Sequence, residues 1–262
     1  MIPSHDVALL LVGHGSARHP EAVRPIFDLA LAVRARGRFA EVAAFFLKAS
    51  PGPEQALGLV TAPWVVVVPV FAGQGYYTGT LIPKALELAG PLTRRAGRVI
   101  VYTAPVGGHA RLPAVLAGRA AAFAVRAGLN PAAASLLLIA HGSSRPGGGA
   151  IPKAIAAAID AERRFAEVAL GFLEQEPRAA AWPSLVRRGT ILALPLLVAQ
   201  GLHASQDIPP LFGLTPGQCG PAAIAGRRVH LVGGLGAEPE LVDIVIDTAE
   251  TALRQSTAPG PD

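Results

Sequence analysis

The sequence predicts an α/β fold that is built twice within one chain. Continuous apolar runs alternate with longer helical stretches, which is the pattern of a parallel sheet flanked by helices. Three segments also recur in the same order, 126 to 127 residues apart, so we expect two similar domains related by internal duplication. They are LLLVGHGSAR (9–18) and LLLIAHGSSR (136–145), RFAEVAAFFLKASP (38–51) and RFAEVALGFLEQEP (164–177), and VVVVPVFAGQGYYTGTLIP (65–83) and ILALPLLVAQGLHASQDIP (191–209).

The predicted strands are runs in which apolar residues follow one another without alternation. Strands of this kind have both faces covered, as in a parallel sheet between two layers of helices. The runs are 8–12, 65–70, 99–102, 136–140, 191–198 and 229–232, with a shorter strand expected at 168–173.

The predicted helices lie between these runs, at 21–36, 82–88, 111–127, 152–165 and 239–254. The sequence Gly-Leu-Asn-Pro at 128–131 is typical of a helix end followed by a turn. We therefore place the domain boundary there and predict domains at 1–130 and 131–262.

The chain has 262 residues, of which 51% are hydrophobic and 16% charged, so each half can bury a substantial core. A formal charge of +5 is compatible with a genomic bias toward arginine or with an acidic ligand. Nucleic acid is disfavoured because the basic residues are dispersed along the sequence.

One cysteine, Cys219, excludes an internal disulfide and agrees with a reducing cytoplasm. The amino-terminal segment lacks the basic region of a signal peptide, and no run of 18 apolar residues exists. We expect a cytoplasmic protein that has no membrane segment. Because the repeat itself can replace a dimer, we expect a monomer or a weak homo-oligomer.

The two copies differ at three matched positions. The second copy has His141, Glu174 and His203, where the first has His14, Lys48 and Tyr77. Each position of the second set lies at or just after the carboxyl end of a predicted strand, which is the edge where open parallel sheets bind ligands. Two imidazoles and a carboxylate suit a divalent first-row metal ion. The alternative is that each histidine only fills a turn; the matched set favours the metal.

The glycine-rich segment 142–149 has two interpretations. Its backbone N–H groups can bind an anion at a helix N-terminus, or Ser143 or Ser144 caps the following helix. It is not a nucleotide-binding Walker loop, because no Gly-Lys-Ser/Thr follows. Arg18 and Arg145 occupy equivalent places and either bind ligand carboxylates or lie in solvent.

Other polar residues have weaker indications. Asp207 either orients His203 or caps the helix that begins near Pro209. His5, His19, His109 and His230 have no counterpart in the other copy, and we expect them at the surface or in loops.

With these motifs the chain resembles the sirohydrochlorin chelatases, the ATP-independent class II enzymes, in their long two-repeat form. The resemblance rests on the HGS turns at His14 and His141, the FLE segment ending at Glu174, and GLHASQDIP at 201–209. It implies two chelatase-like α/β domains with a cleft between them. It also implies that His141, Glu174 and His203 are the catalytic metal ligands and proton acceptors.

The implied reaction is insertion of Co²⁺ or Fe²⁺, or Ni²⁺, into sirohydrochlorin, a tetrapyrrole with eight carboxylates, in cobalamin or sirohaem biosynthesis. The metal is a substrate, and no nucleotide is required. The predicted substrate-binding residues are Arg18, Arg145, His14, Ser143 and Lys48. Two alternatives remain: a non-catalytic tetrapyrrole- or metal-binding protein on the same fold, and a phosphate-ester hydrolase with His141 as its nucleophile.

Overall fold

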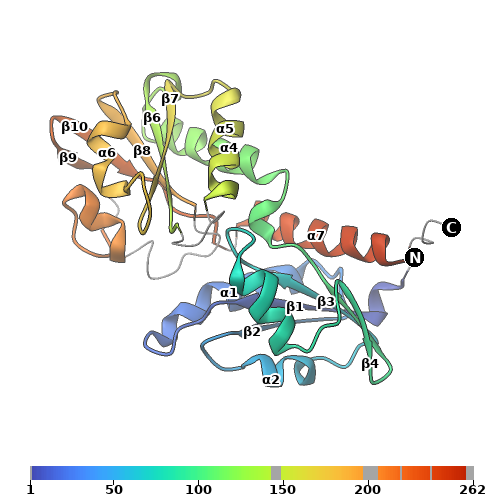
Figure 1. The fold of residues 1–262 in the computed structure, drawn as a ribbon. Helices are drawn as coiled ribbons and strands as arrows, with labels where there is room; N and C mark the ends of the chain where they lie inside the picture. Colours follow the sequence, from blue (N-terminus) through green and yellow to red (C-terminus); the bar gives the residue numbers. More distant parts are fainter. Residues whose placement is uncertain (1, 143–148, 197–205, 219, 237, 258–262) are drawn as a thin grey trace. The chain divides into compact units, whose positions relative to one another are not determined.

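A computed structural model describes residues 2–142, 149–196, 206–218, 220–236 and 238–257. The chain forms two compact units (Figure 1). Unit 1 comprises residues 1–109 and 236–262, and unit 2 comprises residues 110–235.

Unit 1 is built on a five-stranded sheet in the order β2-β1-β3-β5-β4. The central strands pair in parallel, and antiparallel β4 closes one edge. Every residue of β1 is buried, as expected for a strand with both faces covered. The strands are β1 (Val7–Gly13), β2 (Glu41–Phe46), β3 (Trp64–Pro69), β4 (Leu92–Arg95) and β5 (Arg98–Tyr102).

Unit 2 repeats this sheet in the order β7-β6-β8-β10-β9, again with one antiparallel edge strand. Its central strand β6 is also buried along its whole length. The strands are β6 (Ser135–Ala140), β7 (Glu167–Phe172), β8 (Thr190–Pro195), β9 (Ala222–Ile224) and β10 (Arg227–Leu231).

Helices cover both faces of each sheet. In unit 1, the short helices α2 (Pro53–Ala56) and α3 (Ile82–Ala85) pack on one face, while α1 (Arg24–Ala35) and α7 (Pro239–Thr257) contact the sheet and each other. In unit 2, α6 (Trp182–Leu185) packs on one face, and α4 (Leu112–Arg126) and α5 (Ala150–Ala161) contact the strands and each other. Short 3-10 and π turns complete the connections: η1 (Ser4–Asp6), η2 (Pro20–Val23), η3 (Leu57–Leu59), η4 (Tyr77–Leu81), η5 (Val106–Gly108), η6 (Pro131–Ala133), η7 (Ala179–Ala181) and η9 (Pro209–Phe212).

The last helix of each repeat lies in the unit formed by the other repeat. Helix α4 ends the first repeat but belongs to unit 2, and α7 ends the second repeat but belongs to unit 1. Helix α7 buries Leu241, Ile244 and Val245 in unit 1, where it contacts β3 and β5. The compact units therefore differ from the predicted domains 1–130 and 131–262 by this exchange of two helices. The predicted boundary describes the sequence repeat and does not separate the packed units.

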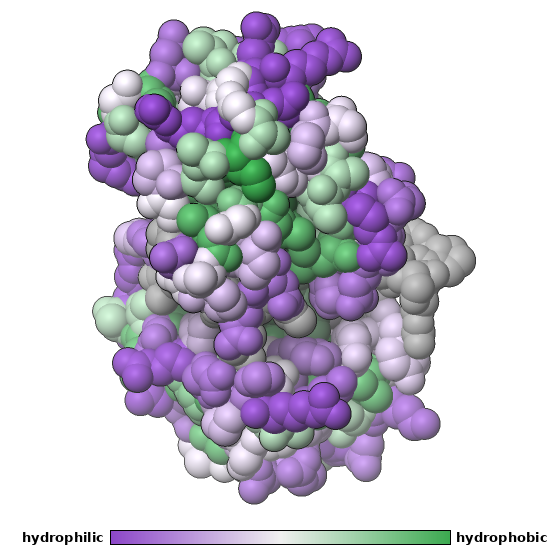
Figure 2. Space-filling view, turned by 90° about the vertical axis from the view of Figure 1, so that its left-hand side faces the viewer, coloured by the Kyte–Doolittle hydropathy of each residue, from purple (hydrophilic) through white to green (hydrophobic). Residues whose placement is uncertain are grey.

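The sequence also missed the short elements. Strands β4 and β9 and helices α2 and α6 span only three or four residues each, which is too short for a periodic pattern. The predicted helix at 82–88 is shorter than expected and follows the π turn η4. Figure 2 faces the β9–β10 side of unit 2 and shows apolar surface there, where Leu211, Leu214, Ile224 and Leu231 are partly buried against the core.

Candidate functional site

Strands β6 and β7 bring His141 and Glu174 together at the carboxyl edge of the unit 2 sheet. The two strands pair in parallel up to Ala140 and Phe172. Their pairing continues beyond the strand ends, because the backbone N–H of Leu173 donates to Ala140 and that of Glu174 to His141, both at 2.9 Å. The His141 Nε2 and a Glu174 carboxylate oxygen lie 3.9 Å apart.

This pair is open to solvent. The His141 side chain is 42% exposed and that of Glu174 is 63% exposed. Because both side chains are accessible, a metal ion can reach the imidazole and the carboxylate from solvent. The predicted residues His141 and Glu174 therefore do meet.

Gly142 makes the turn after His141 possible. Its φ is +85°, a conformation that side chains with a Cβ adopt only at a cost. A Cβ at Gly142 would also lie 2.8 Å from the Gln175 Cγ and 3.2 Å from the Phe172 Cβ. The glycine of the His-Gly pair thus allows the turn to approach the segment that carries Glu174.

The first repeat has the same backbone arrangement. The backbone N–H of Lys48 donates to the carbonyl oxygen of His14 at 2.9 Å, as Glu174 does to His141. Gly15 has a φ of +66°, and a Cβ there would lie 2.9 Å from Ala49 and from Phe46. At these two described strand ends the repeats therefore differ in side chains and share the same backbone hydrogen bond.

In unit 1 all three counterpart residues converge. The rings of His14 and Tyr77 are 4.8 Å apart in an edge-to-face arrangement, and the Lys48 Nζ lies 6.0 Å from the centre of the Tyr77 ring. Phe71 and Tyr76 also contact Tyr77, so an aromatic cluster surrounds this ring. Tyr77 occupies the position that corresponds to His203.

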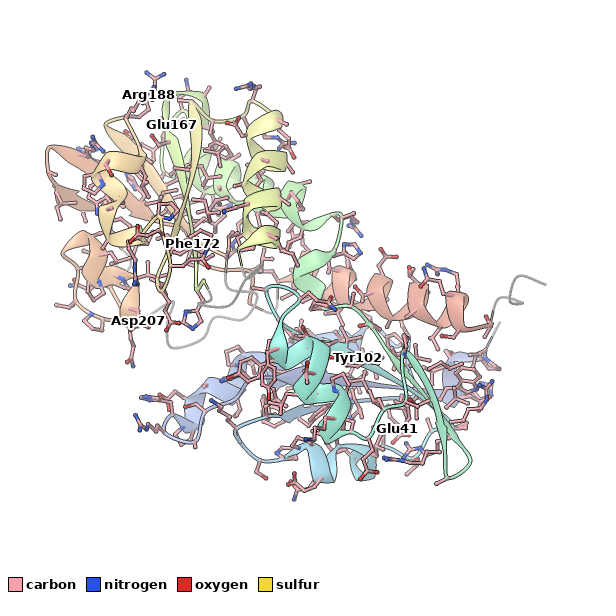
Figure 3. All side chains as sticks on the ribbon, viewed as in Figure 1. Glu41, Tyr102, Glu167, Phe172, Arg188 and Asp207 are labelled. Atoms are coloured by element: carbon pink, nitrogen blue, oxygen red, sulfur yellow. The ribbon has the colours of Figure 1, made fainter. Side chains whose placement is uncertain are left out.

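A hydroxyl from β5 holds the turn on which Tyr77 lies. Tyr77 begins η4, and the Tyr102 O–H donates to the Thr78 carbonyl oxygen at 2.7 Å. Burial raises the pKa of Tyr102, so its hydroxyl stays protonated and continues to donate. Figure 3 shows Tyr102 within unit 1.

Several predicted site residues lie outside the described part of the chain: Ser143, Arg145 and His203. In the first repeat, the counterpart of Ser143 is Ser16, whose hydroxyl accepts hydrogen bonds from the backbone N–H groups of Arg18 and His19. Arg18 itself is exposed. Among the described residues, no group of three His, Cys, Asp or Glu side chains is arranged to hold a metal ion.

His230 differs from expectation, one of the two alternatives for Asp207 is excluded, and His109 lies in the loop after η5 as predicted. Ile208 occupies the N-cap of η9, so Asp207, which is labelled in Figure 3, does not cap that turn as its N-cap residue. His230 is 8% exposed on β10, and its ring packs against Phe123. The His109 side chain is only 15% exposed, and its Nε2 lies 2.9 Å from Asp247 on α7. The expectation of a surface or loop position was wrong for His230. A single histidine within an apolar strand does not show in the sequence whether its side chain is buried.

In the described residues no helix is both long enough and apolar enough to cross a membrane.

Comparisons with known proteins match both repeats. A sequence profile of the CbiX family matches residues 8–122 and 135–252. A probable sirohydrochlorin cobaltochelatase of Halobacterium salinarum is 31% identical over an alignment 269 positions long, which covers 94% of this chain and 91% of that protein.

Solved structures share the fold. A multi-domain protein of Deinococcus radiodurans, described as structurally similar to chelatases, superposes with a TM-score of 0.75 at 31% identity. The match covers 93% of this chain and 54% of that one. SirB from Bacillus subtilis, solved with Fe³⁺, gives a TM-score of 0.73 at 20% identity and covers 96% of this chain and 97% of its own.

Proposed function

Because the chain belongs to the CbiX family, we propose that it is a metal chelatase that inserts a divalent metal ion into sirohydrochlorin. The observation that carries the proposal is the approach of His141 and Glu174 at the carboxyl edge of the unit 2 sheet, 3.9 Å apart. The full-length similarity to a sirohydrochlorin cobaltochelatase supports the same substrate.

We assign the metal to the second repeat, with His141, Glu174 and His203 as ligands. The first repeat supports this choice of three positions, since His14 and Tyr77, the counterparts of His141 and His203, have ring centres only 4.8 Å apart. Lys48 takes the place of the carboxylate there, and its positive charge opposes binding of a dication. One repeat is therefore equipped for metal and the other is not.

The reaction exchanges one dication for two protons. The metal loses water ligands as it enters the macrocycle, and two pyrrole N–H groups lose their protons. A neutral imidazole of His141 or His203, or the Glu174 carboxylate, accepts a proton and passes it to solvent, which the exposure of His141 and Glu174 permits. No electron transfer and no nucleotide are needed.

Basic and polar residues of the two HGS turns are assigned to the carboxylates of the substrate: Arg18, His14 and Lys48 in the first repeat, and Arg145 and Ser143 in the second. Guanidinium groups bind carboxylates through paired hydrogen bonds, and an ammonium group attracts them as a point charge. Co²⁺, Fe²⁺ and Ni²⁺ all accept a His/Glu/His set, so the donor atoms do not select among them. We place the enzyme in the cytoplasm, as a monomer or weak homo-oligomer, in cobalamin or sirohaem biosynthesis.

Anaerobic metal insertion into sirohydrochlorin, followed by absorbance, tests the proposal. We expect wild type to exceed the rate of free metal, and His203→Ala and Glu174→Gln to lose at least about a hundredfold. The control His5→Ala changes an exposed histidine outside both HGS turns and should keep the wild-type rate. Equal rates with and without protein would contradict catalysis and favour a non-catalytic tetrapyrrole- or metal-binding protein. Hydrolysis of a phosphate ester, abolished by His141→Ala, would favour the hydrolase.

A further inference from the structure

Six arginines that are dispersed in the sequence lie along one edge of the unit 2 sheet. They form three consecutive pairs, each just before or at the start of a strand. Because β7, β6, β8 and β10 run parallel, the amino ends of these strands share one edge. The pairs are 163–164 before β7, 187–188 before β8, and 227–228 at the start of β10.

This edge lies at the opposite end of the strands from His141 and Glu174. Figure 3 places Arg188 and Glu167 at the amino ends of the strands, whereas Phe172 ends β7 at the other edge. Figure 2 shows strongly hydrophilic surface at the Arg188 end of unit 2. A ligand held here would not compete for the predicted metal site.

Glu167 fixes the backbone of one pair. Its carboxylate accepts hydrogen bonds from the backbone N–H groups of Arg187 and Arg188 and from the Ser135 hydroxyl. Burial raises the pKa of Glu167, but these hydrogen bonds and the charge of Arg187 outweigh it, so the pKa lies below its ordinary value. The loop is therefore held by backbone contacts, and the two guanidinium groups are not needed to hold it.

Three of the six guanidinium groups have no carboxylate at ion-pair distance among the described residues. They belong to Arg187, Arg188 and Arg228, which are all exposed. The other three are engaged: Arg163 pairs with Asp160 at 3.7 Å, Arg164 with Glu162 at 2.6 Å, and Arg227 donates to the carbonyl oxygens of Pro183 and Val186.

The matching edge of unit 1 lacks these three charges. Glu41 accepts from the backbone N–H groups of Thr61 and Ala62 as Glu167 does from Arg187 and Arg188, so the positions correspond. Strand pairing matches Arg228 to Val99. The unit 1 edge carries Arg94, Arg95 and Arg98 in its last two strands, but Arg95 pairs with Glu87 at 2.6 Å and Arg98 donates to backbone carbonyl oxygens. The exposed arginines of the two edges therefore stand at different positions.

We propose that Arg187, Arg188 and Arg228, here called the arginine edge, bind a carboxylate-rich surface of another protein. Arginine forms paired hydrogen bonds with carboxylates and is enriched among the few residues that dominate protein interfaces. Nucleic acid is disfavoured because three arginines can neutralise only about three phosphates, which gives weak and salt-sensitive binding. In addition, Asp160 and Glu162 at the end of α5 place negative charge near the edge.

A lipid surface is disfavoured for a different reason. The large apolar side chains exposed in the described residues are Phe27, Leu31, Leu59, Tyr76 and Val125, and none belongs to the segments that form the arginine edge. Without an apolar anchor, three charges give only marginal attachment to a membrane. An acidic protein surface needs no such anchor.

Fluorescence anisotropy with a labelled octaglutamate peptide at low salt tests the proposal. We expect Arg187→Gln/Arg188→Gln/Arg228→Gln to raise the dissociation constant about tenfold or more, and added salt to weaken wild-type binding. The control Arg24→Gln/Arg94→Gln/Arg126→Gln removes the same charge elsewhere and should change it less than about twofold. Equal losses in both variants would overturn the proposal.

Two further measurements separate the alternatives. A duplex oligonucleotide or phosphatidylserine vesicles that bind more tightly than the peptide, and lose binding in the edge variant, would assign the edge to phosphate and overturn a protein partner. Metal insertion should be unchanged in both triple variants. Because the backbone bonds to Glu167 persist after substitution, urea unfolding should show both variants folded.

Discussion

The backbone N–H of Glu174 donates to the carbonyl oxygen of His141 at 2.9 Å, and Lys48 makes the same bond to His14. This hydrogen bond lies one step beyond the last paired residues of the strands, Ala140 and Phe172. It places the second residue after β7 or β2 beside the histidine that directly follows β6 or β1. The two repeats thus share this backbone arrangement, here called the frame, and it carries an acid in one repeat and a lysine in the other.

If the frame alone decides where metal ligands meet, Lys48→Glu/Tyr77→His should build a second site in the first repeat. We expect cobalt titration, followed by equilibrium dialysis, to give two bound ions per chain in place of one. The matched control, Lys84→Glu/Tyr76→His, makes the same changes beside the site and should leave one. Unchanged stoichiometry in the first variant would show that the unit 1 frame needs more than these two side chains.

Gly142→Ala should impair metal insertion roughly tenfold or more, because the added Cβ would displace the turn from the Glu174 segment. The conformational cost of a positive φ, about 1–2 kcal/mol, should appear in urea unfolding. Gly226→Ala is the control: its φ is +70°, but a Cβ there meets nothing within 4 Å. It should lose similar stability and keep its activity. Comparable activity losses in both variants would mean that reduced stability, and not displacement of the turn, causes the loss.

His230→Val should make stability less sensitive to mild acid. Burial first, and then the charge of Arg228, lower the pKa of His230, and its Nε2 has no hydrogen-bond partner among the described residues. A histidine whose folded pKa is depressed takes up its proton more readily when unfolded. Its stability contribution is therefore lost as pH falls below the ordinary value near 6.5.

Valine is the residue that strand pairing matches to this position in the first repeat, at Val101. We compare urea unfolding of wild type and His230→Val between pH 7.5 and about 5. The free energy of unfolding should fall more steeply with decreasing pH for wild type than for the variant. Parallel curves would mean that the pKa of His230 is the same in the folded and the unfolded protein.

Ile244→Ala on α7 should destabilise unit 1, although the residue belongs to the second sequence repeat. Ile244 is fully buried, and its truncation should cost about 2–5 kcal/mol. Hydrogen exchange should accelerate in β1 and β3 and leave β6 and β8 protected. Leu116→Ala on α4 should produce the opposite pattern. Accelerated exchange confined to β6 and β8 in Ile244→Ala would contradict the helix exchange.

The sequence predicts the central strands well because each is a continuous apolar run, and it predicts the approach of His141 and Glu174 because parallel strands end at one edge. It could not reveal the helix exchange. Helices α4 and α7 each end their own sequence repeat, so the repeat pattern is the same whichever sheet each one covers. The arginine edge could not be recognised in the sequence because Arg188 and Arg228 are 40 residues apart and lie along one edge only when β8 and β10 pair.

The helix exchange also sets an order of events during synthesis on the ribosome. Unit 2 is one continuous segment, residues 110–235, and is complete before α7 has been translated. Unit 1 has all five strands by residue 102, but the β3 and β5 surface beside α1 stays uncovered until residues 239–257 emerge. At 5–20 residues per second that delay lasts roughly 7–30 s. The unit whose strands are made first is therefore the unit that is completed last, and its exposed β3 and β5 surface is the one that a chaperone would have to shield.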